Sequence, residues 1–147
     1  AAQKLKLFKK ASERMITFQD LKIAILGLTF KPGTDDLREA PSLDNVPLLL
    51  NAGAHLYAFD PVGESNFKRY YPEGKHTPGS ITYVSHAEEA LDGAHLCFIF
   101  TEWPEIRALT PEIFKRQMHI PLVYDGRNLF SLEKMKQAGV EYYSIGR

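Results

Sequence analysis

Cysteine and long apolar runs are scarce in this chain, and neither sign of charge is in excess. The single cysteine excludes an internal disulfide and is typical of a protein from a reducing compartment. No apolar run approaches the roughly 20 residues needed to span a bilayer, and the N-terminus lacks the apolar segment of a signal peptide. Basic and acidic residues each number 18, so no net charge attracts nucleic acid or an anionic membrane. We therefore expect a cytoplasmic protein with neither nucleic acid nor membrane as a partner.

Several motifs of common catalytic chemistries are also missing. The five histidines show neither metal-ligand spacing nor partnering cysteines, so no metal site is expected. There is no Gly-x-Ser-x-Gly elbow and no phosphate-binding P-loop. Cys97 could serve as a nucleophile, but it lies in the apolar run 96–100, where a buried thiol with a raised pKa is expected. We therefore predict no catalytic residue in this chain.

Short apolar runs alternate with helical segments along the chain, and glycine or proline stands at many of the boundaries. Strands are expected at 23–26, 54–59, 81–84, 95–100, 121–124 and 140–143. Helices are expected at 42–51, 65–70 and 131–138, from a capping box at 85–88 to Gly93, and from Thr110 onward. The alternation predicts a doubly wound α/β domain whose sheet is mostly parallel and Rossmann-like, with helices on both faces. Ser42 is the expected N-cap of the first of these helices, although Pro47 lies inside it.

The loop after the first strand gathers charges of both signs. Ile23–Leu26 ends at Gly27, as a buried parallel strand does when it enters a loop. The charged residues that follow are Lys31, Asp35, Asp36, Arg38 and Glu39. In open α/β sheets ligands bind outside the carboxyl ends of the strands, so this loop is a candidate site. We expect the two aspartates to hold the loop through backbone amides and a nearby cation, and Glu39 or Asp35 is the alternative partner for Arg38.

An aspartate at the end of a second strand, Asp60, suggests a ribose contact in a dinucleotide site. The first turn argues against this interpretation, because it lacks the spaced glycines that let a backbone approach a pyrophosphate. Asp60 precedes Pro61 and is better interpreted as a turn residue. Lys31 and Arg127 instead follow two different parallel strands, and their side chains can converge on one anionic ligand.

Four motifs give the chain a family resemblance from about residue 20 onward. Residues 27–42 read GLTFKPGTDDLREAPS, and YAFDP (57–61), TEW (101–103) and YDGRN (124–128) follow in order. The first motif closely resembles the signature that opens the C-terminal domain of UDP-glucose 6-dehydrogenases. This resemblance identifies the chain as similar to the UDP-sugar-binding domain of the nucleotide-sugar dehydrogenase superfamily.

The resemblance implies a function and a set of site residues. The whole enzyme would oxidise UDP-glucose to UDP-glucuronate with NAD, bound mainly by an N-terminal domain that also carries the catalytic cysteine. Phe30, Lys31 and Arg127 would contact the nucleotide sugar, and Arg38 would contact NAD across the cleft. The expected partners are a UDP-sugar, the N-terminal domain of the same enzyme and further copies in a homo-oligomer. The chain alone is expected to be inactive.

Two alternatives stay open, and so does the role of the N-terminus. The enzyme could act on GDP-mannose or a UDP-N-acetyl sugar, or the chain could be a non-catalytic interaction or oligomerisation module. An apolar stripe runs along the N-terminal segment at Leu5, Phe8, Ala11 and Met15. It could pack on its own domain, but the resemblance makes residues 1–19 the end of an interdomain helix and residues 20–147 the domain. We therefore expect the stripe to be weakly anchored here.

Overall fold

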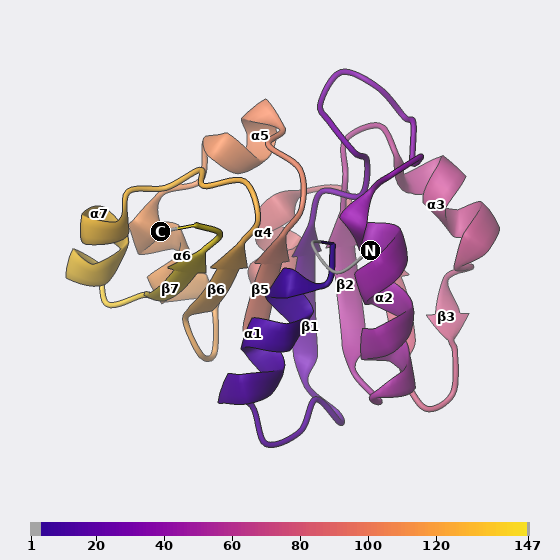
Figure 1. Ribbon diagram of the computed structural model, residues 1–147, viewed down its shortest axis with the longest axis horizontal. Coiled ribbons are helices and arrows are strands. Elements are labelled where there is room, and N and C mark those ends of the chain that lie inside the picture. The colour runs from indigo at the N-terminus through magenta and orange to yellow at the C-terminus, as the bar shows by residue number, and fades with distance from the viewer. Residues whose placement is uncertain (1–3, 147) are drawn as a thin grey trace.

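A computed structural model of the chain describes residues 4–146, which form a sheet with helices on both faces (Figure 1). The strands are β1 (Lys22–Leu26), β2 (His55–Phe59), β3 (Gly74–Lys75), β4 (Ser80–Tyr83), β5 (Leu96–Ile99), β6 (Leu122–Asp125) and β7 (Glu141–Ser144). Their order is β3-β4-β2-β1-β5-β6-β7. Only the β3–β4 pairing is antiparallel among the described residues. The predicted doubly wound, mostly parallel sheet is confirmed.

The helices divide between the two faces of the sheet. They are α1 (Lys6–Arg14), α2 (Pro41–Asn51), α3 (Glu64–Tyr70), α4 (Ala87–Leu91), α5 (Pro104–Arg107), α6 (Pro111–Gln117) and α7 (Leu132–Gln137). Figure 1 shows α1 and α2 in front of the sheet and α4 and α6 behind it. Strand β1 serves both layers, because Ile23 and Ile25 join the core under α1 and α2 while Ala24 and Leu26 join the core under α4 and α6.

Two predicted helix starts differ from the structure. Helix α2 begins at Pro41 after Ala40, and Ser42 makes no cap; its hydroxyl instead donates to the carbonyl of Leu28 at 2.5 Å. Helix α4 begins at Ala87, one residue later than the predicted capping box implies. There the Glu89 carboxylate accepts hydrogen bonds from two backbone amides, those of Ser85 and His86. Strand β3 and helix α5 were not predicted, because both are too short to show a period.

Helix α1 packs on the sheet of this domain, so the expectation of a weakly anchored stripe is wrong. Leu7 is 3% exposed and Ala11 is fully buried. The Phe8 ring lies 5.5 Å from that of Phe18. Arg14 donates two hydrogen bonds to the carboxylate of Glu141 on β7. The assignment of residues 1–19 to an interdomain helix stays a prediction, and residues 1–3 lie outside the described part.

Cys97 is fully buried in β5, as predicted, and burial raises the pKa of its thiol well above the usual value. Among the described residues, no group of three or more histidine, cysteine or acidic side chains could hold a metal ion. None of the helices between residues 4 and 146 has the length and apolar character to cross a membrane.

The buried position of α1 predicts a stability effect. Leu7→Ala should lower the free energy of unfolding by about 2–5 kcal/mol, because it leaves a cavity between α1 and the sheet. Leu132→Ala is a matched control, since Leu132 is 43% exposed at the start of α7. Urea denaturation of both variants measures the difference. Equal midpoints would show that α1 contributes nothing to this domain.

Candidate functional site

The loops that follow the parallel strands meet at one edge of the sheet. Strand β1 pairs with β2 on one side and with β5 on the other, so the strand order reverses between β1 and β5. In doubly wound sheets such a reversal opens a crevice at the carboxyl ends of the strands. The loops after β1, β2, β5 and β6 therefore form the candidate site.

Asp60, which follows β2, fixes its own turn. The residue is 3% exposed. Its Oδ1 accepts hydrogen bonds from the backbone amides of Val62 at 3.0 Å and Gly63 at 2.7 Å. This geometry confirms that Asp60 is a turn residue.

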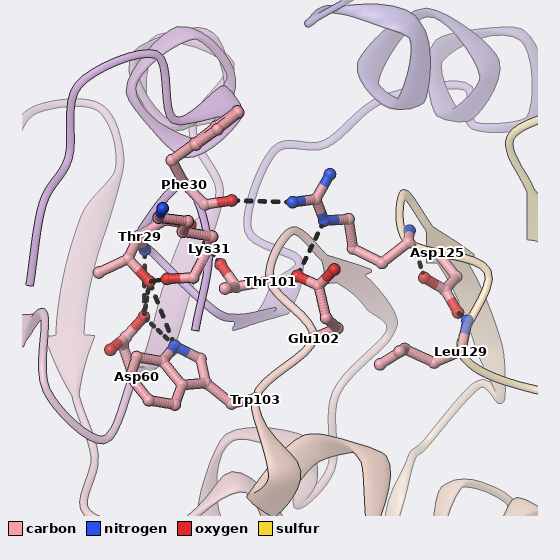
Figure 2. Close-up of polar contacts among 10 residues, drawn as sticks. Thr29, Phe30, Lys31, Asp60, Thr101, Glu102, Trp103, Asp125 and Leu129 are labelled. Carbon is pink, nitrogen blue, oxygen red and sulfur yellow. Dashed lines mark hydrogen bonds and ion pairs between the residues drawn. The ribbon is translucent and has the colours of Figure 1, made fainter. Parts of the chain in front are cut away.

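The second carboxylate oxygen of Asp60 joins three loops. Oδ2 accepts from the amides of Leu28 at 2.7 Å and Thr29 at 3.1 Å, in the loop after β1. It also accepts from the indole N–H of Trp103 at 2.9 Å, after β5 (Figure 2). A buried carboxylate is stable only when such donors replace its hydration. The sequence did not reveal this role, because the donors come from distant loops.

The loops after β1 and β5 close against each other at the switch point. The Thr101 hydroxyl donates to the carbonyl of Thr29 at 2.5 Å. Gly27 has a φ of 92°, and a Cβ there would lie 2.5 Å from the Cβ of Thr101. Thr101 thus packs directly against Gly27 where the two loops meet.

Arg127 and Phe30 come together across the edge. The Arg127 guanidinium donates from Nη2 to the carbonyl of Phe30 at 2.8 Å and from Nε to Glu102 Oε1 at 3.2 Å. Its central carbon lies 5.8 Å from the Phe30 ring centroid. The fully buried Asp125 fixes the start of this loop by accepting from the amide of Arg127 at 2.7 Å. Glu102 was quoted only as part of a motif, and its pairing with Arg127 was not predicted.

Lys31 and Arg38 lie in the same loop as Phe30 but in different surroundings. The Lys31 side chain is exposed and forms no ion pair with any residue from 4 to 146. Arg38 pairs with Asp36 at 2.8 Å, and not with Glu39 or Asp35 as considered above. This hydrogen bond lowers the pKa of Asp36 to about 2. The pair therefore holds the loop, as expected for the two aspartates.

Arg38 does not share a pocket with Arg127. Arg38 lines a cavity of about 500 Å³ together with Arg69 and Tyr70 from the end of α3. Arg127 lines a smaller cavity of about 40 Å³ on the side of α1. The structure thus places Phe30 and Arg127 in contact, whereas Arg38 lines a different pocket.

The fold and the site together define a Rossmann-like domain that lacks the glycine fingerprint and carries cations at its ligand edge. Comparison with known proteins agrees with this class. Residues 24–132 match the family model described as UDP-glucose/GDP-mannose dehydrogenase family, UDP binding domain. The chain therefore belongs to the UDP-glucose/GDP-mannose dehydrogenase family.

Individual relatives cover the chain almost completely. It is 38% identical over 146 residues to the UDP-glucose 6-dehydrogenase TuaD of Bacillus subtilis (strain 168), covering 99% of this chain and 30% of that protein. A UDP-glucose dehydrogenase structure from Pyrobaculum islandicum matches with a TM-score of 0.75 at 27% identity, over 97% of this chain and 29% of that one. A UDP-D-ManNAc dehydrogenase structure from Pyrococcus horikoshii matches with a TM-score of 0.70 at 27% identity, over 99% of this chain and 30% of that one. The chain thus spans about 30% of the length of its curated relative.

The bridging role of Asp60 predicts a large effect of an isosteric change. Asp60→Asn should destabilise the domain by about 2–4 kcal/mol, because an amide group replaces an oxygen that accepts hydrogen bonds in the buried network. Asp92→Asn is the control, since Asp92 is exposed after α4. Thermal unfolding of both variants measures the difference. A melting temperature for Asp60→Asn within a degree of the control would contradict the bridging role.

Proposed function

We propose that this chain is the C-terminal, UDP-sugar-binding domain of an NAD-dependent UDP-glucose 6-dehydrogenase. The whole enzyme would oxidise UDP-glucose to UDP-glucuronate, with an N-terminal domain that binds most of the NAD, and would form a homo-oligomer. The main support is the family match over residues 24–132. The 38% identity to a UDP-glucose 6-dehydrogenase favours UDP-glucose over the UDP-D-ManNAc substrate named for the 27% identical structure.

Phe30, Lys31 and Arg127 are the proposed contacts for the nucleotide sugar. Phe30 is 42% exposed, so part of the residue is accessible to a ligand. The Arg127 guanidinium is held in a fixed orientation by Glu102 and the Phe30 carbonyl, and its planar fork suits a phosphate. Lys31 adds an exposed ammonium one residue after Phe30. The family model that matches residues 24–132 is described as a UDP binding domain, which favours a binding site over a non-catalytic interaction module.

Arg38 is the proposed contact for NAD. The turn after β1 lacks the spaced glycines that let a backbone approach a pyrophosphate. The Arg38 side chain, in contrast, is 89% exposed and is held out from the loop by Asp36. It fits a surface contact with an anionic group of a cofactor that another domain binds. NAD would supply the hydride acceptor, and this chain would help to orient it.

The site assignment predicts which variants lose affinity. Arg127→Ala and Lys31→Ala should each weaken UDP binding tenfold or more, because a charge-assisted hydrogen bond contributes about 1.5–3 kcal/mol. Calorimetric titration of the chain with UDP measures the effect. Arg107→Ala, at an exposed position of α5, is the control.

Stability should respond differently at the two positions. Arg127→Ala should cost about 1 kcal/mol, since the guanidinium also bonds to Phe30 and Glu102. Lys31→Ala should change stability by no more than about 0.5 kcal/mol. If both variants bind UDP as the control does, the assignment of these residues to the nucleotide is wrong.

The last prediction from the proposed function concerns catalysis by the chain alone. With UDP-glucose and NAD it should produce no NADH, because Cys97 is fully buried and its pKa is raised. Absorbance of NADH over several hours measures the activity. Turnover that Cys97→Ala abolishes would contradict this expectation.

A further inference from the structure

A second cation, Lys4, lies beside Arg127 at the ligand edge. Both residues line the pocket of about 40 Å³ that α1, the start of α2 and the loop after β6 enclose. The apolar part of its lining includes Leu7 and Phe100, which are 3% and 2% exposed.

Each of the two cations is held by a carboxylate from a neighbouring loop. Lys4 Nζ lies 2.8 Å from Glu39 Oε2, and Arg127 Nε lies 3.2 Å from Glu102 Oε1. The Glu39 side chain is 75% exposed, so its ion pair with Lys4 is screened by solvent and weak. A diphosphate, which carries more charge and more acceptor oxygens than a carboxylate, competes well for such a lysine.

Two features of the backbone hold Lys4 and Glu39 in place. The fully buried Asn45 of α2 donates from Nδ2 to the carbonyls of Lys4 and Pro41, each at 2.7 Å. Lys4 is thereby fastened to the start of α2. Glu39 has a φ of 64°, a left-handed conformation that non-glycine residues rarely adopt. Strain of this kind is concentrated at functional sites.

We propose that Lys4 and Arg127 together bind the diphosphate of the nucleotide, and that Glu39 holds Lys4 until the diphosphate replaces it. The inference rests on the proposed function. It adds Lys4 as a contact for the diphosphate and the replacement of Glu39 by that diphosphate as the partner of Lys4. At about 40 Å³ the pocket has room for only a few water molecules, so the side chains around it must move for a diphosphate to enter. Opening the exposed Lys4–Glu39 pair is the least costly movement, because Glu39 can turn into solvent.

The test compares UDP with uridine, which lacks the diphosphate. Lys4→Met keeps the aliphatic stem and should weaken UDP binding about tenfold while leaving uridine binding unchanged. Its UDP affinity should also fall less steeply with added NaCl. Glu39→Gln should strengthen UDP binding about two- to fivefold, because the competing carboxylate charge is gone. Lys6→Met, at the exposed first residue of α1, is the matched control.

The outcomes separate this inference from the proposed function. If Lys4→Met binds UDP as Lys6→Met does while Arg127→Ala binds it weakly, the Lys4 assignment is wrong and the proposed function stands. If Lys4→Met weakens UDP and uridine alike and lowers the melting temperature, Lys4 is structural and the inference is overturned. If the parent chain binds no UDP, both are overturned.

Discussion

The ligand edge depends on one buried carboxylate, that of Asp60. Taking a carboxylate out of water costs several kcal/mol unless donors replace the lost hydration. Here the replacement donors are backbone amides from two loops and the Trp103 indole from a third. The loops can supply all of these hydrogen bonds to Asp60 only in one relative arrangement. The buried carboxylate therefore fixes the relative arrangement of the loops, and this arrangement determines where the exposed residues of the edge lie.

The same edge presents three cations already paired, whereas Lys31 is exposed and forms no ion pair with any residue from 4 to 146. Arg38 lies against Asp36, Lys4 against Glu39, and Arg127 against Glu102. The Lys4–Glu39 and Arg38–Asp36 pairs give up little free energy when a phosphate replaces the carboxylate, because each includes a largely exposed side chain and exposed ion pairs are weak. Each pair nevertheless restricts the rotamers of a long side chain before a ligand arrives, which reduces the entropy lost on binding. A chain with equal numbers of basic and acidic residues can thus offer an ordered anion site without a global field.

The parts that followed from the sequence are those set by local pattern. The run from 95 to 100 is apolar on both faces, and β5 is buried on both. Lys31 and Arg127 could be assigned to one edge because parallel strands end there. Pairings between distant loops could not be predicted: Trp103 meets Asp60 across 43 positions, and Glu102 meets Arg127 across 25. Ser42 was misassigned because its hydroxyl finds the Leu28 carbonyl, 14 positions away. For α1 the apolar stripe was visible, but a stripe does not reveal which surface will cover it.

The amides bonded to Asp60 also bear on the local dynamics of the chain. Loop amides normally exchange with solvent deuterium quickly, because brief local openings expose them. The amides of Leu28 and Gly63 lie outside helices and strands. Each donates to the Asp60 carboxylate, which cannot release one loop without also losing its hydrogen bonds to the others. Their exchange must follow the opening of the whole edge. We therefore expect the amides of these two loops to be protected as core amides are, although they lie at the ligand edge.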